Sequence, residues 1–338
     1  MGKNRRNYFA SKWTTRHLNY SNSMIKKAVD QLKNLSKIIN QNKTALCIGT
    51  FDGVHTGHKL LLEKTNLIAK KNDLKSLAIV FKKRPREFIN KNEKRSYLSD
   101  LNFRINKIAQ QGIDYIYPLD FNNEIKNLSA KEFLSFLKKL ANMNHLIVSE
   151  RTKLGYDQLS GGDLFTLCAK LKLGFTFVKM NKVNEQIIST SSINSLIRSG
   201  EIEKANTYLG DQYKVIGKVI KGDQIGSELG FPTANLEISP EILTPGDGVY
   251  ACYVNIENKI CFGALSIGYR PTLKNNHEHK IEVHIIDFNE NIYDKSIEIS
   301  IVKKIRNQVR YESLDKLKKQ IKIDINNIFQ ILKSKKYE

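Results

Sequence analysis

Two histidines close a glycine-containing segment near the start of the chain. The segment reads Gly49-Thr50-Phe51-Asp52-Gly53-Val54-His55-Thr56-Gly57-His58. It follows an apolar run and precedes a helical pattern, so it predicts a strand-to-helix turn. The free N–H groups and the positive dipole end of such a helix favour an anion. His55 and His58 are three residues apart and share nearly one face of the first turn. Two imidazole donors there suit the charge that develops on an α-phosphate during nucleotidyl transfer.

The alternative for this segment is a helix N-terminus capped by Asp52, with two solvent-facing histidines. The two glycines favour a ligand site over this alternative. Gly49 lets the backbone approach a ligand closely, and Gly53 permits a turn that a side chain would not tolerate.

A second segment combines a glycine-spaced loop with small polar residues. Gly217, Gly222 and Gly226 mark a strand that runs into a loop able to fold over phosphates. The chain then reads Leu229-Gly230-Phe231-Pro232-Thr233-Ala234-Asn235-Leu236. On an extended segment Thr233 and Asn235 share a face, so a hydroxyl and an amide oxygen can reach one Mg²⁺, which prefers oxygen ligands. A Thr-x-Asn pair by itself indicates only a turn or a strand edge.

Composition predicts a two-domain protein of the cytoplasm. The 338 residues exceed one compact core, and 41% apolar residues are enough to bury two. No apolar run approaches the roughly 18 residues of a membrane span, and residues 1–23 lack the apolar region of a secretory signal. The cysteines show no CxxC spacing, which argues against a zinc site or a disulfide framework.

The net charge of +21 raises the question of nucleic acid. The lysines are spread along the whole chain among many Asn and Ile residues, as an AT-biased genome would produce. A positive field also helps to capture small anions such as ATP. We therefore expect small-molecule partners and neither a membrane nor nucleic acid as the main partner. The sequence carries no signal for an oligomeric state.

Periodicity divides the chain into three parts. Residues 1–29 hold seven basic side chains and no acidic one, which predicts a disordered tail; a targeting segment and a polyanion-binding arm remain alternatives. Residues 30–210 alternate strand and helix, which predicts a Rossmann-like α/β domain with a parallel sheet. Residues 211–338 predict an all-β domain, a small antiparallel β-barrel followed by one helix.

The expected elements can be placed by residue range. In the α/β domain the strands are expected at 45–48, 77–81, 115–118, 146–148 and 175–178, and the helices at 57–70, 99–111, 129–141, 161–172, 191–199 and 201–209. In the barrel the strands are expected at 213–220, 248–256, 260–267, 280–288 and 296–303, with a last helix whose apolar stripe runs from Leu314 to Leu332. Parallel sheets bind ligands at the carboxyl ends of their strands, where Gly49–His58 lies.

The two segments, in this order, resemble the bifunctional bacterial riboflavin kinase/FAD synthetase family. His55-Thr56-Gly57-His58 is similar to the HxGH signature of nucleotidylyltransferases, and Pro232-Thr233-Ala234-Asn235 is similar to the PTAN motif of riboflavin kinases. The resemblance implies that riboflavin and ATP give FMN, and that FMN and ATP give FAD and pyrophosphate. It also implies Mg²⁺ as the metal.

The resemblance assigns roles to individual residues. It implies Glu282 as the base that takes the proton of the ribityl 5′-hydroxyl, and His55 and His58 as the catalytic pair of adenylyl transfer. It implies Thr233 and Asn235 as metal ligands. The residues that it implies for binding nucleotide or flavin are Gly49, Phe51, Asp52, Gly53, Ser189, Thr190, Ser191, Gly222, Gly226, Gly230, Phe231, Pro232, Thr233 and Asn235.

The N-terminal half departs from the family pattern at three places. Lys82-Lys83-Arg84-Pro85 replaces an Asp/Glu-Pro-His/Gln-Pro run, and Ser149-Glu150-Arg151-Thr152 replaces Gly-Glu-Asp-Phe. Ile188–Asn194 keeps the hydroxyls of a triphosphate loop but ends in Asn194 instead of arginine. Losing a bidentate Arg–phosphate contact costs on the order of 2 kcal/mol, roughly 30-fold in rate or affinity. Arg198, one turn later, is either a substitute or an ordinary surface arginine.

Three functions follow from these patterns. The first is the bifunctional enzyme, with FAD synthesis weakened by the departures. The second is a riboflavin kinase with a degenerate adenylyltransferase module. The third is a basic nucleic-acid-binding protein on a nucleotidyltransferase scaffold, which would need basic residues clustered with aromatic ones.

Overall fold

A computed structural model describes residues 32–90, 96–179, 182–183, 186–222, 225–257, 259–269 and 279–335. The predicted tail at 1–29 lies outside these ranges. The chain forms two compact units. The first consists of residues 1–51, 57–94 and 101–181, and the second of residues 52–56, 95–100 and 182–338.

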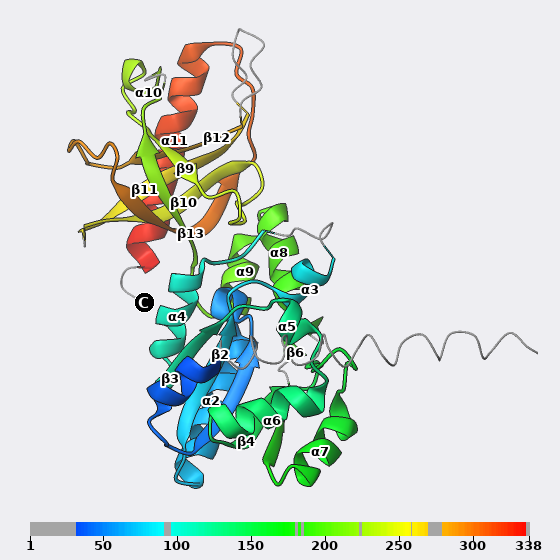
Figure 1. Cartoon of the computed structure of the whole chain (residues 1–338). Helices are drawn as coiled ribbons and strands as arrows, with labels where there is room; N and C mark the ends of the chain where they lie inside the picture. Colours follow the sequence, from blue (N-terminus) through cyan, green and yellow to red (C-terminus); the bar gives the residue numbers. More distant parts are fainter. Residues whose placement is uncertain are drawn as a thin grey trace, which may run out of the picture. The chain divides into compact units, whose positions relative to one another are not determined.

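The first unit contains a five-stranded parallel sheet, as predicted (Figure 1). Its strands lie in the order β3-β2-β1-β4-β5. Their bounds are β1 Thr44–Gly49, β2 Lys75–Phe81, β3 Tyr115–Leu119, β4 Met143–Ser149 and β5 Gly174–Val178. β1 and β4 are buried along most of their length, which explains why their residues read as continuous apolar runs.

Helices connect these strands. Residues 32–39 are helical, and the further helices are α2 Thr56–Lys71, α3 Pro85–Ile89, α4 Leu101–Ala109, α5 Asn123–Lys126, α6 Ala130–Leu140 and α7 Gly161–Lys170. The capping box of Ser129 and Glu132 is present at the start of α6. The short helices α3 and α5 were not predicted, since five and four residues are too few to show a period.

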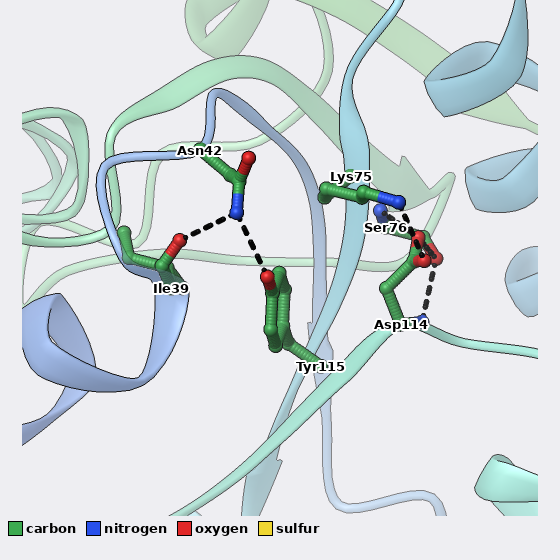
Figure 2. A network of polar contacts seen from close by, with 6 residues as sticks. All are labelled: Ile39, Asn42, Lys75, Ser76, Asp114 and Tyr115. Atoms are coloured by element: carbon green, nitrogen blue, oxygen red, sulfur yellow. Dashed lines mark hydrogen bonds and ion pairs between the residues drawn. The ribbon is translucent and has the colours of Figure 1, made fainter.

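Polar contacts tie together the starts of three strands, as Figure 2 shows. Asn42, just before β1, donates to the Tyr115 hydroxyl at 2.9 Å. The Asp114 carboxylate, just before β3, accepts from the backbone N–H and the hydroxyl of Ser76 on β2, both at 2.8 Å. Lys75 pairs with the same carboxylate at 3.4 Å. This network lies at the amino edge of the sheet, opposite the edge where parallel sheets bind ligands.

The second unit contains a closed antiparallel barrel of six strands in the order β10-β11-β12-β9-β8-β13. The bounds are β8 Tyr213–Ile220, β9 Ala234–Ile238, β10 Gly248–Ile256, β11 Lys259–Tyr269, β12 His279–Ile285 and β13 Ser296–Arg306. The sequence predicted a barrel with five of these strands and missed β9. In β9 the inward residues Ala234, Leu236 and Ile238 alternate with polar ones. In the sequence the same residues belong to the Thr-x-Asn segment, which hides the strand.

Three longer helices belong to this unit. α8 Thr190–Ser199 and α9 Ile202–Leu209 add Ile193, Ile197, Ile202, Ala205 and Leu209 to the apolar core of the barrel. α11 Leu314–Lys335 packs outside the barrel on β10, β11 and β13 (Figure 1). Gly210 ends α9 in the left-handed conformation.

Short elements complete the described chain. They are the 3₁₀ turn η1 Asp52–Val54, the two-stranded ribbon β6 Lys182–Val183 and β7 Gln186–Ile187, and α10 Ile225–Glu228. The predicted fold class, a parallel α/β domain with a small antiparallel barrel and a terminal helix, is confirmed. Within the described ranges, every helix is too short or too polar to cross a membrane.

Candidate functional site

The turn between β1 and α2 is held in an unusual backbone conformation. φ is +53° at Phe51, +72° at Gly53 and +40° at Val54. A positive φ is uncommon for a bulky residue and still rarer for a β-branched one, so the turn stores strain that its surroundings must balance. The Phe51 ring fills the space beside Gly49, where a Cβ would lie 3.3 Å from it. At Gly49 the missing side chain therefore accommodates this ring.

Asp52 is bonded to residues 98 and 99, which belong to the same unit. Its buried carboxylate accepts hydrogen bonds from the backbone N–H groups of Leu98 (2.9 Å) and Ser99 (3.2 Å). The Gly53 N–H in turn donates to the Ser99 hydroxyl at 3.0 Å. These bonds show Asp52 shaping the turn; contact with a nucleotide stays a prediction.

The two histidines lie at the start of α2. His55 precedes the helix and is 3% exposed, and burial lowers the pKa of its imidazole to about 4. It is therefore neutral at pH 7 and presents one N–H donor. His58 is the third residue of α2, and its ring centroid lies 5.3 Å from that of Phe51. The alternative of two solvent-facing histidines is therefore wrong for His55.

The predicted hydroxyl run lies at the start of α8. Ser189 is the N-cap, and its hydroxyl accepts from the Ser192 N–H at 3.2 Å, so this side chain serves the helix itself. Thr190 and Ser191 are the first residues of the helix. The Oδ1 atom of Asn194 is buried and has no hydrogen-bond partner among the described residues. Arg198, further along α8, is exposed.

In the barrel, strand register brings together Asn235 and Glu282. These residues lie directly opposite each other on β9 and β12, and Ser266 on β11 lies opposite Glu282 on the other side. Residues directly opposite in an antiparallel pair point to the same face, with Cβ atoms about 5 Å apart. Neighbouring residues Val283 and Leu236 point into the barrel core, so Asn235 and Glu282 share the outer face.

Two glycines, Gly222 and Gly226, lie against the Thr-x-Asn pair. A Cβ at Gly222 would be 2.0 Å from Nδ2 of Asn235, and one at Gly226 would be 3.1 Å from the Thr233 hydroxyl oxygen. Gly230 has φ +84° in the turn that follows. The structure thus gathers residues that the sequence predicted from three separate stretches of chain.

His284 supports the turn before Thr233. Its Nδ1 lies 2.7 Å from the Pro232 carbonyl oxygen, and its ring meets the Phe231 ring edge-on at 5.8 Å. A carbonyl only accepts, so Nδ1 is the donor. From sequence alone His284 is assigned only a structural role, because nothing in a sequence reveals which carbonyl the ring faces.

A pocket of about 450 Å³ adjoins the same turn. Pro232 and Thr233 line it together with apolar side chains from the barrel strands, among them Val219, Val283 and Ile285, and with the 288–293 segment. This size and mostly apolar lining are typical of small-molecule sites. Sequence reasoning missed the 288–293 segment, which carries no motif.

Two protein families match separate parts of the chain. The FAD synthetase family matches residues 37–194, and the riboflavin kinase family matches residues 209–332. The first match includes both histidines, and the second includes Thr233, Asn235 and Glu282.

Two relatives that match most of this chain are bifunctional enzymes. The bifunctional riboflavin kinase/FMN adenylyltransferase of Buchnera aphidicola subsp. Schizaphis graminum is 33% identical, covering 88% of this chain and 96% of its own. The Bacillus subtilis protein of the same description is 31% identical, covering 84% and 91%. The crystal structure of a macrolide-efflux protein from Streptococcus pneumoniae is similar with a TM-score of 0.77 at 27% identity, covering 84% of this chain and 93% of that one.

Proposed function

Because the chain belongs to the bifunctional riboflavin kinase/FMN adenylyltransferase family, we propose that its two halves make FMN and then FAD, with FAD synthesis the weaker activity. The barrel phosphorylates riboflavin with ATP. The turn between β1 and α2, with His55 and His58, serves the transfer of AMP to FMN with release of pyrophosphate. A cytoplasmic location, where ATP is made, is part of the same proposal. The observation that carries it is the convergence of Gly222, Thr233, Asn235 and Glu282 in the barrel.

The kinase site divides into three parts. The pocket beside Thr233 takes the adenine and ribose of ATP, since it offers apolar walls next to the phosphate-handling turn. Gly222 and Gly226, which lie beside Asn235 and Thr233, let the backbone approach the phosphates. Glu282, on the outer face beside Asn235, takes the proton of the ribityl hydroxyl as that oxygen attacks the γ-phosphate.

Thr233 and Asn235 are proposed to hold Mg²⁺. A hydroxyl and an amide oxygen are the hard ligands that this ion prefers, and Asn235 lies beside Gly222 and Thr233 beside Gly226. When bound, the ion neutralises charge on the phosphates. The two protein ligands leave most of its coordination sphere to water and substrate.

In the adenylyltransferase half, His55 and the start of α2 are proposed to stabilise charge on the α-phosphate. A neutral His55 donates one hydrogen bond, and a bound polyphosphate would favour its protonated form. No protein nucleophile is required, because the FMN phosphate oxygen attacks. The Ser189 hydroxyl caps α8, so Thr190, Ser191 and the helix N-terminus remain as the proposed phosphate contacts there.

A second candidate is a riboflavin kinase without FAD synthesis. It is favoured by Asn194, which replaces the expected arginine and keeps Oδ1 buried without a partner among the described residues. An amide cannot supply the bidentate, charged contact of a guanidinium.

One time course tests both candidates. Purified protein is incubated with riboflavin, Mg²⁺ and ATP, and FMN and FAD are separated by chromatography. The proposal predicts that FMN accumulates first and FAD follows slowly. FMN alone, even when FMN and ATP are both supplied in excess, would leave the kinase-only function.

A further inference from the structure

Arg104 on α4 is a buried cation at the carboxyl edge of the parallel sheet. Only 2% of the residue is exposed. Its guanidinium donates to three backbone carbonyls: Thr50 at 2.7 Å, Phe81 at 2.9 Å and Lys82 at 2.8 Å. All four residues belong to the first unit. The planar guanidinium, with five donors and a permanent charge, suits several acceptors at once.

These bonds continue the pairing of β1 and β2 beyond its last ladder pair. The register of the two strands ends at Gly49 opposite Val80. Thr50 directly follows β1 and Phe81 is the last residue of β2, and Arg104 bridges their carbonyl oxygens. The guanidinium thus fixes the separation of the two strand ends where the strained turn begins at Phe51.

The Thr50 carbonyl also sets the direction of the next N–H. The peptide bonds of the described residues are trans, so the C=O of Thr50 and the N–H of Phe51 lie in one plane and point in opposite directions. Holding the carbonyl on Arg104 therefore turns the Phe51 N–H away from the guanidinium. Backbone N–H groups at the carboxyl ends of parallel strands are typical donors to phosphate.

We propose that Arg104 is a positioning residue for adenylyl transfer, which orients the Thr50–Phe51 peptide so that its N–H faces the polyphosphate of ATP. The inference rests on the proposed FAD synthesis and extends it to a residue outside the histidine motif. Arg104 acts through the backbone and does not touch the nucleotide.

The test uses the full-length protein, whose riboflavin kinase activity serves as an internal reference. Arg104→Met should lower kcat/KM for FAD synthesis at least tenfold and leave FMN formation unchanged. Arg104→Lys keeps the charge and part of the donors, so it should recover part of the loss. The matched control is Thr44→Val, which removes a buried 2.7 Å hydrogen bond to the Ala141 carbonyl at the opposite end of β1.

Hydrogen exchange followed by mass spectrometry gives a readout that needs no activity. Peptides spanning residues 49–58 and 79–83 should exchange faster in Arg104→Met than in Thr44→Val. Unchanged exchange in these peptides would overturn the inference, whether or not the wild-type protein makes FAD. Equal losses of FAD synthesis in Arg104→Met and Thr44→Val would overturn it too, by assigning Arg104 a purely structural role. Absence of FAD from the wild-type protein would instead contradict the proposed function.

Discussion

The side chain of His284 supports the turn at Pro232 in the proposed kinase site. Its Nδ1 donates to the Pro232 carbonyl at 2.7 Å, directly before the proposed metal ligand Thr233. Losing one such bond costs about 1 kcal/mol, or about fivefold in affinity. His284→Ala should therefore raise KM for MgATP about fivefold in a steady-state assay of FMN formation, with a smaller effect on kcat.

Two further variants sharpen this test. His284→Asn retains a side-chain donor and should recover part of the affinity. His279→Ala removes a histidine at the start of the same strand, where it pairs with Asp247, and should leave KM for MgATP unchanged. An unchanged KM in His284→Ala would show that the turn holds its position without this bond.

For single residues, the sequence predicted which side chains belong to the site better than which residues lie next to them. Thr233, Asn235 and Glu282 were found through their motifs, but only the register of β9 and β12 places Asn235 opposite Glu282. The roles of His284 and Arg104 could not be found, since both act on backbone carbonyls that a sequence does not orient. Asp52 was predicted beside the ligand, and the structure shows it bonded to Leu98 and Ser99.

Among the elements, the loop at Gly222 leaves no room for a side chain at that residue. A Cβ at Gly222 would lie 2.0 Å from Nδ2 of Asn235, so Gly222→Ala must displace either the loop or the amide. We expect FMN formation to fall at least tenfold, measured at saturating riboflavin. Gly162→Ala is the matched control, because a Cβ there meets nothing within 4 Å. Similar activity in both variants would contradict the close packing of the loop on Asn235.

The strand starts joined in Figure 2 make a pH-dependent contribution to stability. Partial burial raises the pKa of Asp114, but hydrogen bonds from Ser76 and the charge of Lys75 outweigh it and lower the pKa. The folded state thus favours the carboxylate. Its stabilising effect is present above the unfolded pKa of about 3.9 and is lost as pH falls through the folded value.

Asp114→Asn should therefore lower the free energy of unfolding by about 1 kcal/mol at pH 7 and by less in acid. Urea unfolding at several pH values measures this difference. Asp120→Asn removes a carboxylate that pairs with Lys82 at the surface, and should change stability little. A constant difference between wild type and Asp114→Asn across the pH range would contradict the assignment.

The elements that sequence reasoning found are those with a long period or a long apolar run. The five parallel strands and the helices α2, α4, α6 and α7 were predicted close to their observed bounds. β9 was missed although Ala234, Leu236 and Ile238 alternate correctly, because five residues that carry a ligand motif do not stand out as a strand. In the structure β9 joins β12 to β8 and so closes the barrel.

For the whole molecule, the placement of α8 and α9 bears on where the kinase domain begins. Their apolar residues share one core with Tyr213 and the barrel, whereas periodicity put them in the domain before residue 210. That boundary remains a prediction. A fragment starting at residue 211 should form FMN, and one starting at residue 186 should do so with a higher Tm, because it keeps this packing.

Calorimetry and an FMN assay of both fragments make the comparison. Equal Tm values would mean that α8 and α9 add nothing to the stability of the barrel. If neither fragment forms FMN although both are folded, the kinase needs residues before 186. The overall class could be predicted because the alternation of strand and helix changes to strands alone near Tyr213. Periodicity does not show that α8 and α9, which precede this change, pack on the barrel that follows it.

The most direct measurement of the central claim supplies riboflavin or FMN separately to two variants of the full-length protein. Glu282→Gln should lose FMN formation from riboflavin, by roughly 10²-fold or more, and still convert supplied FMN to FAD. The double variant His55→Ala, His58→Ala should form FMN at the wild-type rate and no FAD. Loss of both activities in either variant, or FAD formation by the double variant, would contradict the assignment of one reaction to each half of the chain.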